Sequence, residues 1–251
     1  MKISRLFQLV LAAMIAVNYS GCGSAAKPAA DMSHGDHGGH EHSAPGKSSE
    51  HSSTLLVTSE PAKPNAQAIT KMRLMLHDSK GQMVKEFEAV HEKLAHFIVV
   101  REGLDQFAHL HPVVDPDGMM SVDYSFPVGG TYYLFLDYKP KGQLPATAQA
   151  KIEVEGAAPA PPPLVRNVPG ALQGDGLDAQ VTLIPSQGDS AQTMTFLVTD
   201  SSGKPVSDLQ PYLGAMGHLV VLSANAKEYV HAHPKDVSGA DGKVPLEVHF
   251  P

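Results

Sequence analysis

An internal duplication constrains the fold of this chain more than any other feature of its sequence. A short apolar run that begins with a histidine, residues 96–100, is followed after a polar turn by a His-x-His-Pro motif at residues 109–112. The same arrangement recurs at residues 218–222 and 231–234, and each histidine lies 122 positions after its counterpart. Self-similarity at a fixed offset predicts two copies of one structural unit.

The similarity between the two copies extends beyond the histidines. Asp78 and Gly81 recur at the same offset as Asp200 and Gly203. After the His-x-His-Pro motif the offset becomes 124, because the second copy has two extra residues there. The printed sequence ends at Pro251, whereas in the first copy an alternating strand follows the equivalent proline. We therefore expect the second copy to be incomplete.

Each copy of the motif is expected to form a β-hairpin, because two apolar runs flank a polar turn. Symmetric pairing sets His96 opposite His111 and Ile98 opposite His109, and alternate residues of a strand share one face. The prediction is one metal-binding triad in each copy. The two triads are His96, His109 and His111, and His218, His231 and His233. A register shift of one residue would send His96 to the other face. The alternative is a solvated strand end whose rings bond to loop carbonyls.

Hydrophobic patterning predicts an all-β protein. Residues 54–155 contain about seven short segments of β character separated by turn signals, which favours an immunoglobulin-like sandwich. A Pro-rich linker, residues 156–168, follows and is expected to be stiff and extended. A second, incomplete β-sandwich domain is expected at residues 169–251. The predicted fold is therefore two tandem β-sandwich domains.

The first 22 residues predict export and lipidation. Lys2 and Arg5 precede an apolar run that is far shorter than the roughly 20 residues of a spanning helix. Residues 20–22 resemble the bacterial lipobox, in which the cysteine becomes the lipid-modified first residue. We expect Cys22 to anchor the chain to a lipid bilayer on the extracytoplasmic side of the cell envelope, which is the periplasmic side in a Gram-negative cell. The alternative is an ordinary signal peptide with an incidental cysteine.

A His-rich tether is predicted at residues 23–53, which hold too few large apolar side chains to fold. His34, His37, His40 and His42 lie there within nine residues and are typical of a metal-binding tract. The alternative is a soluble spacer. Cys22 is the only cysteine, so a folded metal site must use nitrogen, oxygen or methionine sulfur. A formal net charge of -7 argues against a nucleic-acid partner.

The repeated hairpin with its His-x-His-Pro motif, together with residues 208–218, resembles a group of exported, often lipid-anchored bacterial proteins associated with copper and heavy-metal handling. The resemblance covers both copies and not the tether. It implies small immunoglobulin-like or cupredoxin-like sandwich domains. The positions that match are His96, His109, His111, His218, His231 and His233.

The function favoured by these features is a non-enzymatic, membrane-anchored protein that binds metal for sequestration or homeostasis. Copper is the favoured ion, with zinc or nickel as alternatives, because imidazole suits all three. The reference histidine pKa of about 6.5 predicts that affinity falls between about pH 7 and pH 5. Met216 precedes His218 by two residues, but Leu94 occupies the equivalent position, so we expect Met216 in a core. No protein partner is indicated.

Two other functions are consistent with the sequence. Three histidines and a water are also the ligands of a hydrolytic zinc site, although no carboxylate is placed beside the histidines in both copies. A structural or adhesive β-sandwich array with incidental histidines is the other alternative. A stoichiometric metal site separates this last alternative from the first two.

Overall fold

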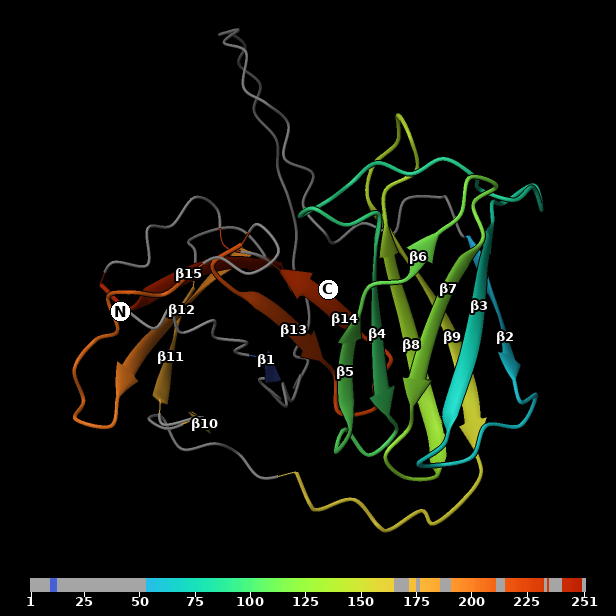
Figure 1. Ribbon diagram of the computed structural model, residues 1–251. Helices are drawn as coiled ribbons and strands as arrows, with labels where there is room; N and C mark the ends of the chain where they lie inside the picture. The colour runs from blue at the N-terminus through green and yellow to red at the C-terminus, as the bar shows by residue number, and fades with distance from the viewer. Residues whose placement is uncertain are drawn as a thin grey trace, which may run out of the picture.

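The structure, a computed structural model, describes residues 10–12, 53–164, 172–174, 177–185, 191–210, 215–232, 234 and 241–249. Every regular element in these residues is a β-strand, so the predicted all-β class is confirmed (Figure 1). None of the described segments forms a helix that is long and apolar enough to cross a membrane. Outside the described residues lie Cys22, His34, His37, His40, His42 and His233.

The first copy forms a sandwich of two four-stranded antiparallel sheets (Figure 1). One sheet has the order β2 (Thr54–Glu60), β3 (Ile69–His77), β7 (Met120–Ser125) and β6 (Val113–Val114). The other sheet has the order β5 (Phe107–Leu110), β4 (Ala95–Arg101), β8 (Gly130–Tyr138) and β9 (Ala146–Val154). The histidine-bearing hairpin β4–β5 thus lies at one side of the second sheet.

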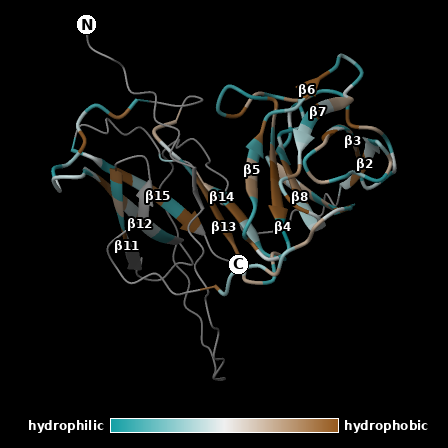
Figure 2. Ribbon diagram, turned by 60° about the horizontal axis from the view of Figure 1, so that its bottom comes forward, coloured by the Kyte–Doolittle hydropathy of each residue, from teal (hydrophilic) through white to brown (hydrophobic). Residues whose placement is uncertain are grey.

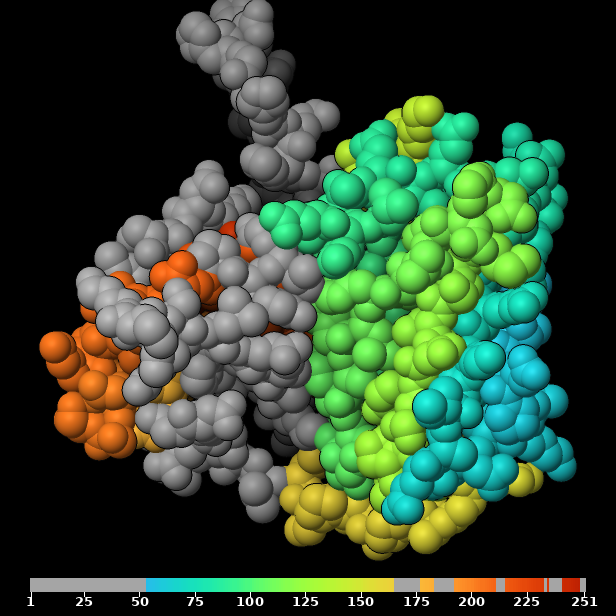
Figure 3. Space-filling view, in the orientation of Figure 1, coloured from blue at the N-terminus to red at the C-terminus, as the bar shows by residue number. Residues whose placement is uncertain are grey.

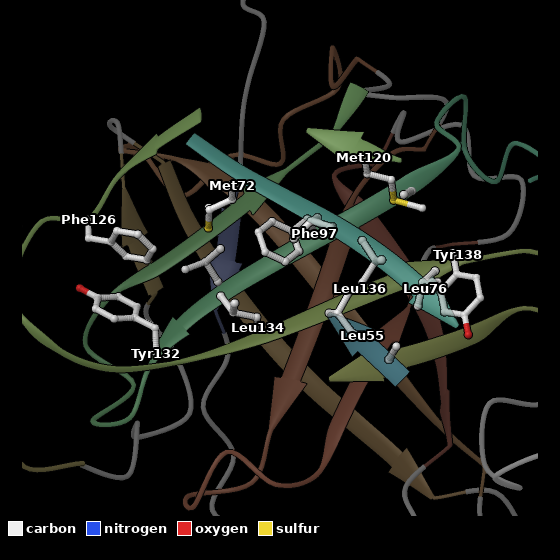
Figure 4. Packing of buried hydrophobic residues seen from close by; sticks show 14 of the residues in the cluster. Leu55, Met72, Leu76, Phe97, Met120, Phe126, Tyr132, Leu134, Leu136 and Tyr138 are labelled. Carbon is white, nitrogen blue, oxygen red and sulfur yellow. The ribbon is translucent and has the colours of Figure 1, made fainter. Parts of the chain in front are cut away.

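The inner faces of these two sheets meet in a core of alternating apolar side chains (Figure 4). Met72 and Leu76 of β3, Phe97 of β4 and Leu134 of β8 all lie in this core, and all four are at most 1% exposed. Burial of each such side chain contributes roughly 1.5–3 kcal/mol to stability. This core fixes the backbone of β4 and therefore the position of the histidine at its start.

Strand β4 is buried on both faces. All seven of its residues are buried. Phe97 and Val99 pack into the sandwich core, whereas Ile98 and Val100 pack against the second copy. A strand covered on both sides has a continuous apolar run instead of an alternating pattern. This explains why residues 97–100 contain no polar side chain.

The second copy forms a four-stranded sheet and supplies two strands of a three-stranded sheet, whose third strand comes from residues 10–12. The first has the order β10 (Leu172–Gly174), β11 (Leu177–Pro185), β12 (Ala191–Asp200) and β15 (Lys243–His249). The second has the order β1 (Val10–Ala12), β13 (His218–Leu222) and β14 (Tyr229–Ala232), with β1 parallel to β13. A separate apolar core joins Met194 and Phe196 of β12 to Leu219 and Val221 of β13.

The described part of the Pro-rich linker, residues 156–164, is exposed and contains no strand. It follows β9 along the lower edge of the molecule (Figure 3). Two hydrogen bonds fix it to the first sandwich: the Gly129 amide donates to the Ala157 carbonyl, and the Arg101 guanidinium donates to the Pro159 carbonyl at 2.8 Å. The first residues of the linker are therefore held against the sandwich.

Equivalent faces of the two hairpins pack against each other, and apolar residues follow β4 and β13 in Figure 2. Four pairs of equivalent residues form most of this interface core: Ile98 and Val220, Val100 and Leu222, Leu104 and Ala226, Phe107 and Tyr229. Tyr133 and Phe135 of β8 complete it, and the Phe135 and Tyr229 rings stack with centroids 4.5 Å apart. Such packing of one surface on its own equivalent resembles a twofold dimer interface. It brings the two sets of histidines face to face.

Candidate metal site

The two hairpins have equivalent registers, and the register predicted for the first is confirmed. Ile98 lies opposite His109 in the β4–β5 pair, and Val220 lies opposite His231 in the β13–β14 pair. Because side chains alternate along a strand, His109 points to the face opposite that of its neighbour Leu110. Leu110 packs against the sandwich core, as expected. The histidines therefore project toward the other copy.

Five of the predicted histidines converge in one cluster: His96, His109, His111, His218 and His231. His109 lies at its centre. Its ring centroid is 5.3 Å from that of His96 and 4.8 Å from that of His111. The corresponding distances to His218 and His231, across the interface, are 5.5 Å and 5.1 Å.

The structure places all of the predicted first triad, but only His218 and His231 of the second, because His233 lies outside the described residues. His96, His109 and His111 form a group whose ligand atoms lie within 4.8 Å of one another, as predicted for the first hairpin. The second group of this kind contains His218 and His231 together with His109, which belongs to the first copy. Sequence reasoning treated the two hairpins as independent, and their face-to-face packing makes His109 common to both groups.

The spacing of the ring nitrogens suits a metal ion. Nδ1 of His96 lies 3.0 Å from Nε2 of His109. Two nitrogens bound to one tetrahedral zinc ion, each about 2.0–2.1 Å from it, lie about 3.3 Å apart. Nε2 of His111 is buried and has no hydrogen-bond partner among the described residues. A buried nitrogen without a partner is costly, and a metal ion would satisfy it.

The Val90 carbonyl orients His96. The distance from Nε2 of His96 to the Val90 oxygen is 3.0 Å, and the side chain is 3% exposed. A carbonyl can only accept, so Nε2 carries the proton and Nδ1 keeps its lone pair. Nδ1 is the nitrogen that faces His109. This hydrogen bond is the kind that fixes the tautomer of a metal-binding histidine.

The Asp137 carboxylate orients His231 across the interface. Asp137 lies on β8 directly opposite His96, and its Oδ2 accepts a hydrogen bond of 2.8 Å from Nδ1 of His231. The Tyr229 hydroxyl donates to the same oxygen at 2.6 Å, and the Thr147 hydroxyl donates to Oδ1 at 2.6 Å. Nε2 of His231 is then the nitrogen that can bind a metal, as in carboxylate–histidine–metal arrangements.

Burial keeps the first-copy histidines neutral. Burial, together with the charges of neighbouring histidines, lowers the pKa of His109 to about 2 and that of His111 to about 4. Burial also lowers the pKa of His96, although the bond to the Val90 carbonyl opposes the shift. Neutral imidazole is the form that binds metal. The cluster is thus prepared for a cation at neutral pH.

Asp137 is held in its charged form. Burial alone would raise the pKa of its carboxyl group, but the hydrogen bonds and the attraction from His231, with Thr147 and Tyr229, lower the pKa below its usual value. Burial, together with the charge of Asp137, raises the pKa of the Tyr229 hydroxyl well above its usual value. The tyrosine therefore remains a donor to the carboxylate.

Sequence reasoning did not identify Asp137, Tyr229 or His91 as parts of the site. His91 lies in the turn before β4, with its ring centroid 6.5 Å from that of His218. Burial lowers its pKa, and the neighbouring His231 adds to the shift. Leucine occupies the equivalent position in the second copy, so the duplication could not reveal it. Met216 packs against the core of the second copy, as expected.

Comparisons with known proteins identify a family without a defined function. A family model described as "Domain of unknown function (DUF8832)" matches residues 50–156 and 172–251. No curated protein matches the sequence.

Two solved structures are similar at low identity. The adhesin InvE of Yersinia pseudotuberculosis is 15% identical with a TM-score of 0.25, over 78% of this chain and 51% of the adhesin. A β-glucuronidase of Parabacteroides merdae, with glycerol in its active site, is 10% identical with a TM-score of 0.22, over 80% of this chain and 22% of the enzyme. The chain thus spans about half the length of the adhesin. Similarity at this level carries no functional argument, and function is inferred from the site.

Proposed function

We propose that this chain, which belongs to the family described as "Domain of unknown function (DUF8832)", is a metal-binding protein whose ion is held by the histidine cluster between its two copies. The observation that carries the proposal is the convergence of four histidines on a fifth, His109. Two of them are oriented by acceptors that fix their tautomers, the Val90 carbonyl for His96 and the Asp137 carboxylate for His231. A solvated strand end would not need such orientation.

Copper is the ion we propose. The described cluster offers imidazole nitrogens and no thiolate, a donor set that suits copper, zinc and nickel. Among these divalent ions the general order of affinity places Cu(II) highest. Zinc and nickel are the competing ions in the titration below.

The proposed role is sequestration or homeostasis of the ion without catalysis. A hydrolytic site needs a base that can accept a proton from bound water. Asp137 lies beside the cluster, but both of its oxygens already accept hydrogen bonds, from His231, Tyr229 and Thr147. Its lowered pKa also makes it a weak base.

The proposal places this protein on the extracytoplasmic face of a membrane, held through a lipidated Cys22. The support for this part lies in the sequence: the short apolar run, the lipobox-like residues 20–22 and the His-rich tract that follows. In this arrangement the histidines of the tract collect ions near the bilayer and the cluster holds one tightly. Mass spectrometry of the membrane-extracted protein tests the lipid directly, and an unmodified Cys22 would contradict the anchor.

Titration of the mature chain with Cu(II), Zn(II) and Ni(II) tests the proposed function. A second form that lacks residues 23–53 removes the tract histidines. Calorimetry should show that this form still binds Cu(II) stoichiometrically and more tightly than the other two ions. His77→Gln is a matched control, because His77 ends β3 on the sheet that does not carry the cluster. No binding by the form without the tract would disprove the proposed site.

A further inference from the structure

We infer that the cluster offers a single ion two alternative three-histidine sites that share His109, an inference that rests on the metal-binding function proposed above. The intra-copy triad is His96, His109 and His111, all from the first hairpin. The bridging triad is His109, His218 and His231, and it joins the two copies. The chain therefore holds one ion in one of two places rather than two ions in two places.

The distances separate the two triads from a single five-histidine site. Two nitrogens bound to one ion at about 2.1 Å can be at most about 4.2 Å apart. The ligand atoms of each triad lie within 4.8 Å of one another, so a small movement of the rings closes either triad around an ion. Among the described residues, no larger group of histidines meets even this limit.

The shared histidine excludes simultaneous occupancy of both triads. A neutral imidazole presents one lone pair, because its other nitrogen carries a proton. His109 can therefore complete only one triad at a time while it stays neutral. Two cations bound to one ring would also repel each other strongly. An ion can still pass from one triad to the other by exchanging its remaining ligands around His109.

Each triad has its own orienting group, so either triad can hold the ion. The Val90 carbonyl fixes His96 in the intra-copy triad, at 3.0 Å. The Asp137 carboxylate fixes His231 in the bridging triad, at 2.8 Å. The bridging triad also gains the negative charge of that carboxylate in contact with one of its ligands, which favours a divalent cation there.

Two alternative sites for one ion have additive association constants. When one ion distributes between two mutually exclusive sites, the association constant of the whole chain is the sum of the two individual constants. His111→Gln removes only the intra-copy triad, and His218→Gln removes only the bridging triad. The constants of these two variants should add up to that of the parent, so one variant keeps at least about half of the parent affinity. His109→Gln disables both triads.

Cu(II) titration of the mature chain without residues 23–53, in competition with a chelator of known affinity, measures these constants. We expect one ion per chain, additive constants for the two single variants, and a loss of about 100-fold or more for His109→Gln and for the double variant His111→Gln/His218→Gln. His77→Gln should match the parent. Thermal unfolding of each metal-free variant confirms that it folds.

Two results would overturn the inference while leaving the proposed function intact. One is a loss of about tenfold or more in both single variants, which would indicate a single site using ligands from both sets. The other is two ions bound per chain. Electron paramagnetic resonance gives a second measurement that does not depend on affinity: the parent Cu(II) spectrum should be a weighted sum of the spectra of the two single variants. A parent chain that binds no copper would instead overturn the proposed function itself.

Discussion

The hairpins β4–β5 and β13–β14 have the same motif and the same register but different surroundings. Strand β4 lies between β5 and β8, so Asp137 of β8 stands directly opposite His96. Strand β13 pairs with β14, and its other neighbour is the three-residue β1, which lies in the predicted signal peptide and is absent from the proposed mature chain. The carboxylate supplied by the first copy therefore orients a histidine of the second, His231. The comparison teaches that a duplicated motif can build one composite site in which equivalent histidines have unequal roles.

The largest expected effect is a difference in Cu(II) affinity between variants of His109 and of its equivalent, His231. His109→Ala should weaken Cu(II) binding about 100-fold or more, because this residue belongs to both triads. His231→Ala should cost less than His109→Ala, because the intra-copy triad is left intact. Competition titrations of the two variants make the measurement. Equal losses would mean that the two hairpins contribute equally, as the duplication alone suggests.

Asp137→Asn should affect only the bridging triad. In a His111→Gln background, where that triad alone remains, the substitution should weaken Cu(II) binding about 10–100-fold, the usual effect of removing a carboxylate behind a ligating histidine. In a His218→Gln background, where only the intra-copy triad remains, the affinity should stay within about twofold. A similar loss in both backgrounds would contradict the assigned role of Asp137.

Leu110→Ala probes the residue next to His109, which points to the opposite face of the hairpin. Leu110 is only partly buried against the sandwich core, so the substitution should lower the free energy of unfolding by about 1–2 kcal/mol, less than for a fully buried leucine. Urea denaturation measures this change. Copper affinity should remain that of the parent, and a loss comparable to that of His109→Ala would show that the two side chains are not separated as described.

The smallest expected effect is the change in Cu(II) affinity between about pH 7 and pH 5, measured on the chain without residues 23–53. The reference histidine pKa predicts a collapse of affinity in this range, but burial lowers the pKa of His109 to about 2 and that of His111 to about 4. Protons therefore compete with the ion at the intra-copy triad only as the pH falls toward about 4. In the His218→Gln variant, which retains only this triad, affinity should change little between pH 7 and pH 5. A steep loss across that range would contradict the burial of these rings.

Acid should destabilise the metal-free protein over a range set by the same two groups. Their pKa values are lower in the folded chain than in the unfolded chain, where they are near 6.5. The unfolded chain therefore binds more protons, and stability falls as the pH drops from about 6.5 toward about 4. Substitution of His109 by Gln should reduce this dependence in urea denaturation curves at pH 7 and pH 4.5. If the difference in the free energy of unfolding between these two pH values stays the same in the variant, His109 is not a neutral, shielded ring in the folded chain.

The sequence was sufficient to predict what depends on local pattern. Alternation along a strand and the symmetry of a hairpin placed His96, His109 and His111 on one face, and the structure has Ile98 opposite His109 as expected. The continuous apolar run of residues 97–100 also contained a signal of burial on both faces, which the hairpin hypothesis did not use.

The remaining features depend on contacts between distant segments. Asp137 could be recognised only by knowing that β8 pairs with β4, because it has no histidine near it in the sequence. His91 lies in a turn where its backbone adopts a φ of 49°, and no periodic pattern places such a residue. The docking of the two hairpins depends on which outer surfaces complement each other, and a strand pattern does not encode this.

The most direct test of the central claim is the crystal structure of the copper-loaded mature chain, with the ion located by its anomalous scattering. The claim that the two copies share one site predicts copper within about 2.1 Å of a His109 ring nitrogen, with its remaining histidine ligands drawn from the intra-copy or the bridging triad. Density divided between two positions that both contact His109, with a total occupancy of one ion, would agree with the two alternative triads. Two fully occupied ions, one on each hairpin and with no histidine in common, would contradict the account.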